Sequence, residues 1–83
     1  MPFKLVYHSE VRETDIPKLD RKIQERIKKA IESRLTVAPH QYGEPLKRTL
    51  KGYWKLRVGD YRVVFRVSGT EVWIFGIIHR KDI

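Results

Sequence analysis

The chain has 83 residues, which is enough for one small domain and too few for a second. Hydrophobic residues make up 41% of it, enough for a core, and the absence of cysteine excludes disulfides, Cys-ligated zinc and thiol nucleophiles. Lys and Arg number 18 against 10 Asp and Glu, and the net charge of +8 indicates either a polyanionic partner or simply a soluble basic surface.

The N-terminal residues predict a strand followed by a short helix. Residues 3–8 alternate well enough for a strand that turns three side chains to one side: Phe3, Leu5 and Tyr7. Ser9 is a candidate N-cap for the residues that follow it. Because proline disrupts a helix interior, this helix is expected to stop near Thr14 or to break just before Pro17.

An amphipathic helix is predicted over residues 19–35. Its apolar residues recur at spacings of three and four, and Asp20 can cap its start. Its polar face is rich in cations: Lys22, Arg26, Lys28 and Lys29. These cations form either a ridge that binds RNA or a solvated face partly paired with Glu25 and Glu32. The helical spacing of the two acids favours the solvated face.

Residues 36–52 contain two prolines and two glycines, which indicates an irregular connector. Three strands are predicted after it, at residues 53–58, 61–67 and 72–78, joined by turns at Gly59-Asp60 and at residues 68–70. The resulting fold class is α+β. It has an N-terminal strand and one or two helices packed on a small antiparallel sheet that ends in a three-stranded meander.

Alternation along these strands sorts their side chains onto two faces, one apolar and expected to pack against the helix. The other face collects a basic set with a single acid, Glu71, near a turn: Tyr53, Lys55, Arg57, Arg62, Arg66 and His79. Since like charges on adjacent strands repel, this face is expected to bind an anion; otherwise its members are dispersed surface cations. Strict alternation turns Arg80 to the wrong face, unless the last strand ends or bulges at His79.

The same alternation puts Trp73, Phe75 and Ile77 on the basic face. An exposed apolar strip of this kind is typical of a surface that binds a partner. Alternatively, the connector at residues 36–52 folds back and covers the strip.

The cations point to phosphodiester chemistry. The sequence shows no carboxylate pair, metal-ligand spacing or phosphate-binding glycine motif, and its three histidines are far apart. Cations can instead hold a phosphodiester and stabilise the extra negative charge of its transition state. In RNA the 2′-hydroxyl is an internal nucleophile, so a protein needs only to orient it, remove its proton and protonate the leaving 5′-oxygen. No metal and no other cofactor are expected.

Two segments carry a family resemblance. Residues 50–65, centred on Arg57-Val58-Gly59-Asp60-Tyr61-Arg62, and residues 77–83, with His79-Arg80, resemble the RelE branch of the RelE/ParE toxin superfamily. The order of strand, helix and meander agrees with that branch over nearly the whole chain. The resemblance implies a single RelE-like domain over residues 1–83 with the microbial RNase-like fold. It also implies a toxin that enters the ribosomal A site, cuts mRNA there and is neutralised by a cognate antitoxin.

The resemblance assigns roles to individual residues. Lys55 matches a lysine that acts as base or contacts phosphate, Arg62 matches the arginine that stabilises the scissile phosphate, and Arg80 matches one that stabilises the transition state or protonates the leaving group. His79 fits the members that have His-Arg here and completes the catalytic candidates. Arg57 matches a neighbouring basic position that contacts RNA in several members. With three further residues that are not assigned by the resemblance, it makes up the candidates for RNA binding: Arg57, Lys51, Arg66 and Tyr53.

The sequence departs from the family pattern at two places. Tyr53 stands where some members carry a second lysine. Many members place a functional tyrosine directly after a segment like residues 80–83, whereas this sequence stops at Ile83. A tyrosine appended after Ile83 is therefore expected to raise cleavage if the chain is a shortened toxin.

Three functions fit these features: a metal-independent, ribosome-dependent mRNA endoribonuclease of a type II toxin–antitoxin system, a ParE-like inhibitor of DNA gyrase, or a non-enzymatic module that binds RNA or ribosomes. The cations at Lys55, Arg57, Arg62 and Arg80 favour the first, because a toxin that binds only protein needs no phosphate site. The expected partners are an antitoxin in a hetero-oligomer, the ribosome and mRNA. No apolar run reaches the roughly 20 residues of a membrane span, no signal-peptide core follows Met1, and cysteine is absent, so a cytoplasmic protein away from membranes is expected.

Overall fold

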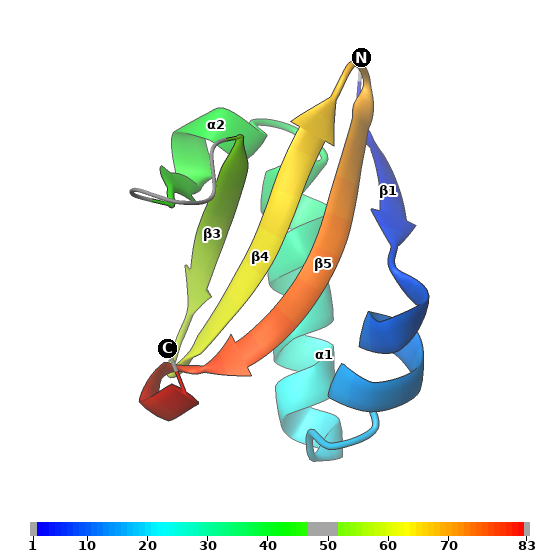
Figure 1. Ribbon diagram of the computed structural model, residues 1–83, viewed down its shortest axis with the longest axis vertical. Coiled ribbons are helices and arrows are strands. Elements are labelled where there is room, and N and C mark those ends of the chain that lie inside the picture. Colours follow the sequence, from blue (N-terminus) through cyan, green and yellow to red (C-terminus); the bar gives the residue numbers. More distant parts are fainter. Residues whose placement is uncertain (1, 47–51, 83) are drawn as a thin grey trace.

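A mixed five-stranded sheet with one long helix against one of its faces forms the protein (Figure 1). The computed structural model describes residues 2–46 and 52–82. Strands β2 (Glu44–Pro45), β3 (Tyr53–Val58), β4 (Tyr61–Ser68) and β5 (Glu71–His79) are antiparallel neighbours, and β1 (Lys4–Tyr7) lies parallel beside β5. The predicted α+β class and C-terminal meander are confirmed, and the parallel strand β1 makes the sheet mixed rather than antiparallel.

The N-terminal helical turn begins differently from the prediction. The backbone N–H of Glu10 donates to Nδ1 of His8 at 3.2 Å, so His8 supplies the side-chain contact at this start and the prediction of a Ser9 cap is wrong. The turn continues as a π-helical segment, η1 (Val11–Asp15), which Ile16 closes by donating its N–H to the Val11 carbonyl at 2.9 Å. It ends before Pro17, as predicted.

The main helix α1 (Arg21–Ala30) continues into a π-helical segment, η2 (Ile31–Leu35). The predicted cap is confirmed, because Oδ1 of Asp20 accepts the N–H of Ile23 at 3.0 Å. The connector predicted as irregular contains a short helix, α2 (Pro39–Tyr42), and strand β2. No helix of the described ranges is long and apolar enough to cross a membrane.

The core lies between α1 and the sheet. It combines the apolar stripe of the helix with the inward side chains of β3, β4 and β5, and its fully buried members include Ile27, Ile31, Leu56, Phe65 and Ile74. Complete burial of such a side chain contributes about 1.5–3 kcal/mol. The three side chains predicted to share one side of the N-terminal strand all pack against this core: Phe3, Leu5 and Tyr7.

Two glycine turns set the registers of the meander. Gly59 has φ +58°, a conformation that side chains disfavour, and the Gly59-Asp60 turn pairs Val58 with Tyr61 as predicted. The next turn is tighter than expected, because β4 extends to Ser68, which pairs directly with Glu71.

A β-bulge in β5 changes the faces of its last residues. Val64 pairs with Gly76 but Phe65 pairs with Ile74, so Phe75 is the extra residue. After the bulge, Ile77 faces α1 and is buried, and His79 shares the face of Tyr61. The prediction that Ile77 and His79 lie on the basic face is therefore wrong, and Ile78 takes a place there opposite Arg62.

An acidic side chain closes the sheet edge next to this bulge. The N–H of Ile77 donates to Oδ2 of Asp15 at 3.0 Å, across 62 positions of sequence. Strand β1 has ended by this point, since its register with β5 stops at Tyr7 and Ile74. Segment η1 therefore takes over from β1 at the edge of β5.

Candidate nuclease site

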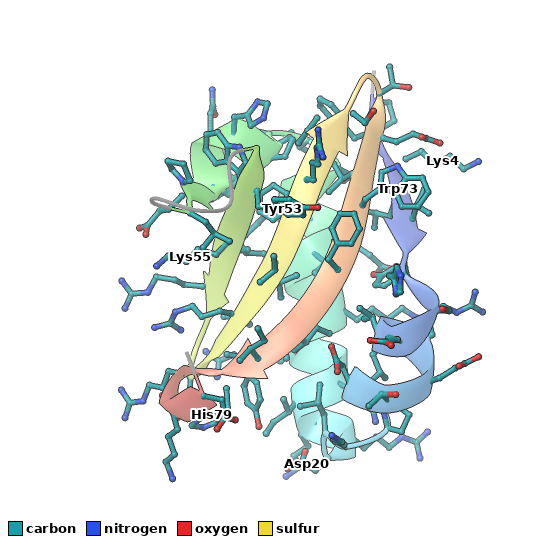
Figure 2. All side chains as sticks on the ribbon, viewed as in Figure 1. Lys4, Asp20, Tyr53, Lys55, Trp73 and His79 are labelled. Atoms are coloured by element: carbon teal, nitrogen blue, oxygen red, sulfur yellow. The ribbon has the colours of Figure 1, made fainter. Side chains whose placement is uncertain are left out.

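The candidate site lies on the face of the sheet opposite α1, which we call the open face (Figure 2). The registers place its residues in rows that cross the strands. One row contains Arg57, Arg62 and Ile78, and another contains Tyr53, Arg66 and Trp73. Lys55 lies between these rows on β3, opposite Val64. Alternation thus brought together the five cross-strand candidates, as predicted.

Arg57 and Arg62 are directly opposite each other, so two positive side chains share one cross-strand position. The guanidinium of Arg62 is held by the turn, since its Nη1 donates to the carbonyl oxygen of Gly59 at 3.1 Å and of Tyr61 at 3.0 Å. Like charges opposite each other destabilise a hairpin. An anion between these two side chains would relieve that repulsion.

Arg80 reaches the same turn. Strand β5 ends at His79, and a 3₁₀ segment, η3 (Arg80–Asp82), follows. The N–H of Arg80 donates to the carbonyl of Asp60 at 2.7 Å, and its Nε lies 3.5 Å from Oδ1 of Asp60. The sequence allows Arg80 to reach the basic residues only if the last strand ends or bulges at His79, and the strand does end there. We call Arg57, Arg62 and Arg80, gathered around Gly59-Asp60, the turn cluster.

His79 lies apart from the predicted catalytic lysine. Its ring packs edge-on against Tyr61 with centroids 5.0 Å apart, and its Nδ1 accepts the N–H of Lys81 at 3.2 Å. Figure 2 shows His79 at the end of the sheet near η3, well away from Lys55 on β3. Lys51 lies outside the described residues.

Glu44 is a site residue that sequence reasoning missed. The two-residue strand β2 places it directly opposite Lys55, so a second acid joins the face on which only Glu71 was expected. Strand β2 pairs over just Glu44 and Pro45, and a proline in so short a strand gives no alternation to recognise.

An aromatic cluster occupies the middle of the open face. Phe75, at the bulge, lies 5.4 Å from Tyr53, 6.4 Å from Trp73 and 6.1 Å from His8, measured between ring centroids. Arg66 completes the cluster, with its guanidinium carbon 5.6 Å from the centre of the Tyr53 ring. A flat aromatic group beside cations can stack on nucleobases.

The described part of the connector packs elsewhere. The ring of His40 in α2 packs at a tilt of 45° against Trp54 with centroids 4.6 Å apart, and Trp54 belongs to the face that α1 covers. Residues 36–46 therefore do not fold over Trp73 and Phe75.

The electrostatics of the molecule differ between the two faces. Behind the sheet, burial raises the pKa of Tyr7, and the nearby carboxylate of Glu32 adds to the effect. Among the described residues, no three potential ligand side chains of His, Asp or Glu come together as a metal site. At the hairpin turn, the guanidinium of Arg62 contacts Gly59 and that of Arg80 pairs with the carboxylate of Asp60, while Arg57 stands opposite Arg62 in the cross-strand register. Guanidinium groups placed near one another in this way suit the binding of a phosphate group.

Known proteins resemble the chain over nearly its whole length. A sequence model described as ParE toxin of type II toxin–antitoxin system, parDE, matches residues 6–83. Toxin RelG of Mycobacterium tuberculosis is 32% identical over 85 residues, covering 100% of this chain and 97% of RelG.

Solved structures share the fold. The toxin–antitoxin complex RelBE2 from Mycobacterium tuberculosis contains a chain that superposes with a TM-score of 0.88 at 29% identity, covering 96% of this chain and 93% of that one. A chain of the RelB–RelE complex from Methanococcus jannaschii gives a TM-score of 0.71 at 23% identity, covering 93% and 92%. The chain is thus a member of the RelE/ParE superfamily, the toxins of type II toxin–antitoxin systems.

Proposed function

We propose that this toxin is an endoribonuclease that cuts mRNA on the ribosome and needs no metal ion for the chemical step. The observation that carries the proposal is the turn cluster: Arg62 and Arg80 contact the Gly59-Asp60 turn with their side chains, and Arg57 stands opposite Arg62. Lys55 lies two residues from Arg57 on the same face of β3. A protein that acted only by binding another protein would have no need for this concentration of guanidinium groups.

The geometry suggests a separate role for each of these side chains at the scissile phosphate. Arg62, fixed through Nη1 to the turn, offers its remaining donors to the non-bridging oxygens, and Arg57 approaches from the opposite strand. Lys55 is the candidate to take the proton of the 2′-hydroxyl. Attack of that oxygen on phosphorus forms a cyclic phosphate and expels the 5′-oxygen, which takes a proton from a donor at the η3 end.

Two side chains near η3 are candidates to act on the leaving 5′-oxygen. Arg80 lies in the turn cluster, whereas His79 packs against Tyr61 on the other face of the sheet at its end. Arg80 therefore fits the role of stabilising the negative charge that develops in the transition state. His79 can act only if its free ring nitrogen reaches around the end of β5.

A cognate antitoxin is the proposed partner in a cytoplasmic hetero-oligomer. The similar chains come from complexes of a toxin with its antitoxin. The aromatic cluster and the turn cluster give an antitoxin segment both an apolar and a basic surface to cover. Acidic and apolar side chains of a segment that folds on binding would suit this face.

Inhibition of DNA gyrase is the second candidate, because the matching sequence model is named for ParE. Two assays with the purified toxin separate the candidates: cleavage of a defined mRNA on programmed ribosomes, and supercoiling by DNA gyrase. We expect cleavage within codons at the ribosomal A site and normal supercoiling. Blocked supercoiling with intact mRNA would replace the proposal by the gyrase function.

The metal requirement is tested in the same assay. Ribosomes are kept assembled with polyamines while divalent ions are chelated, and cleavage of the pre-bound mRNA is followed. Unchanged cleavage is expected. Loss of cleavage on ribosomes that sedimentation shows to be intact would contradict a metal-independent step.

A further inference from the structure

A second cluster of cations lies on the other side of β3, between the strand and the helix. A cavity of about 250 Å³ is bounded by α1 and η2 on one side and by the end of β3 with its turn on the other. Its charged lining consists entirely of cations: Arg26, Lys29, Arg34 and Arg57. Ser33 adds a hydroxyl group. We call this cavity the basic notch.

The charges of the main helix are sorted between its two flanks. The flank at the basic notch carries Arg26, Lys29 and Arg34. The opposite flank lines a different groove and mixes signs, with Glu25 and Glu32 beside Arg21 and Lys28. Arg21 and Glu25 approach to 4.0 Å there. The sequence favours a solvated face partly paired with Glu25 and Glu32, and these two acids lie on the flank away from the notch.

The notch connects with the turn cluster through Gly59. A side chain at Gly59 would place its Cβ 2.9 Å from Nη1 of Arg26, so this guanidinium lies directly against the turn. On the other side, Arg62 donates to the carbonyl oxygen of the same Gly59. Arg57 lines the notch and also stands opposite Arg62. Arg26, Arg57 and Arg62 therefore follow one another around the end of β3, and the one carboxylate of this turn, that of Asp60, is paired with Arg80.

The backbone adds a donor at the same place. Because Val58 and Tyr61 form the hydrogen-bonded pair that closes the hairpin, the N–H of Arg57 points away from β4, toward the outer edge of β3. Strand β2 pairs with β3 at Trp54 and Lys55 and does not extend to this residue. Guanidinium forks, an ammonium group, a hydroxyl and an outward N–H are the donors that typically hold a phosphate.

We propose that the basic notch is a second phosphate-binding site, which takes the backbone of an RNA segment other than the one cleaved. The choice of RNA as ligand rests on the proposed function. It agrees with the succession of Arg26, Arg57 and Arg62 around Gly59, because a polyphosphate chain or a folded RNA can occupy both sites together, whereas an isolated anion gains nothing from that succession.

The test uses two double variants with the same change in charge. R26Q/K29Q removes two cations of the notch, and R21Q/K28Q removes two from the opposite flank of α1. All four side chains are exposed, and glutamine preserves helix propensity, so both variants should fold. Thermal unfolding checks this directly. The probe is a short 2′-O-methyl RNA, which cannot be cleaved, titrated at several salt concentrations.

The salt dependence of affinity distinguishes a built site from general charge. We expect R26Q/K29Q to weaken binding about three- to tenfold near 0.1 M salt and to reduce the slope of log K against log salt by about 1, with a smaller effect of R21Q/K28Q. Equal losses in both variants would show that only net charge matters and would overturn the proposal. So would wild-type RNA binding by R26Q/K29Q accompanied by weakened binding of the antitoxin, which would make the notch a protein contact.

The same variants keep this proposal separate from the proposed function. If the wild-type toxin cuts mRNA on ribosomes and R26Q/K29Q binds RNA and ribosomes as wild type does, the notch proposal fails and the nuclease function stands. The wild-type toxin could instead cut no mRNA but bind RNA with a slope of log K against log salt that R26Q/K29Q reduces. In that case the notch proposal stands and the nuclease function fails.

Discussion

Nη1 of Arg62 donates to the carbonyl oxygen of Gly59 at 3.1 Å, which ties the side chain to the turn of its own hairpin. The contact holds one nitrogen of the guanidinium and leaves its other donors for a ligand. Ordering an arginine only on binding costs free energy in lost rotamers. The hydrogen bond to the turn already orders the Arg62 side chain before a ligand binds, so less free energy is lost on binding. Arg62 is therefore the best-positioned of the cations on the open face.

Cleavage should need the planar guanidinium group of Arg62 and not only its positive charge. Replacement by lysine (Arg62→Lys) keeps the charge but loses the planar fork that the turn carbonyls and a phosphate share. We expect cleavage on programmed ribosomes to fall by about 10²-fold, the usual range for removing one donor that stabilises a transition state. Ribosome binding should change little. Wild-type cleavage by this variant would mean that a point charge suffices.

Alanine at Gly59 should weaken RNA binding, and the same change at Gly69 is the matched control. Both glycines have nearly the same φ, +58° and +59°, but only Gly59 has a neighbour, Arg26, where a Cβ would stand. The left-handed conformation should cost each alanine variant about 1–2 kcal/mol. Urea unfolding should show similar losses, because Arg26 is flexible and can move. Weakened RNA binding is expected for Gly59→Ala alone. Equal weakening of RNA binding in both variants would show that Gly59 does not act through the basic notch.

Asp15 should stabilise the edge of the sheet beside the bulge. Alanine at this position removes the acceptor that the Ile77 N–H reaches at 3.0 Å, and a part-buried bond to a carboxylate is worth about 1–2 kcal/mol. Asparagine keeps an acceptor oxygen and should lose less. Amide hydrogen exchange gives a local reading, since the Ile77 N–H should exchange faster in Asp15→Ala. Unchanged protection there would show that the bond contributes nothing.

Local features of the fold could be predicted because neighbouring residues determine them. The cap of Asp20 on Ile23, the end of the first helical turn before Pro17 and the two-residue turn at Gly59 all depend on short-range chemistry. The same holds for the cross-strand row of Arg57 and Arg62, which follows from the length of the turn and the period of two along each strand.

The bulge and the additional strands could not be predicted for physical reasons. Residues 72–78 are apolar on both faces, so inserting Phe75 as an extra residue leaves the pattern unchanged while it moves Ile77 and His79 to the other side. Strand β2 is too short to show a period, and its Glu44 was missed with it. The parallel pairing of β1 with β5 joins the two ends of the chain, which local patterns do not encode.

Tyr7 should make stability fall at high pH. Burial raises its pKa above 10.0, so the folded protein keeps the phenol protonated at pH values where the unfolded chain releases the proton. The contribution is complete below about pH 10 and is lost as pH rises from there through the pKa of the folded state. Urea midpoints of the wild type and Tyr7→Phe should therefore diverge above pH 10 in favour of phenylalanine. A constant difference between pH 8 and pH 10.5 would contradict the assignment.

The antitoxin should cover one of the two tryptophans. Trp73 lies on the open face next to Phe75, whereas Trp54 lies on the α1 side against His40. With single-tryptophan variants (Trp54→Phe and Trp73→Phe), the fluorescence of Trp73 should lose access to a soluble quencher when the antitoxin binds, and that of Trp54 should change little. A complex in which Trp73 stays fully accessible would place the antitoxin elsewhere.

Single-turnover cleavage of mRNA on ribosomes saturated with toxin shows whether the turn cluster cuts RNA. Three proteins are compared: wild type, Arg62→Ala and Arg66→Ala, the last removing an equal charge from the same strand and face but outside the turn cluster. We expect a loss of about 10²–10³-fold in the cleavage rate for Arg62→Ala and a much smaller loss for Arg66→Ala. Equal rates for the two variants, or no cleavage by the folded wild-type toxin bound to ribosomes, would contradict this role of the turn cluster.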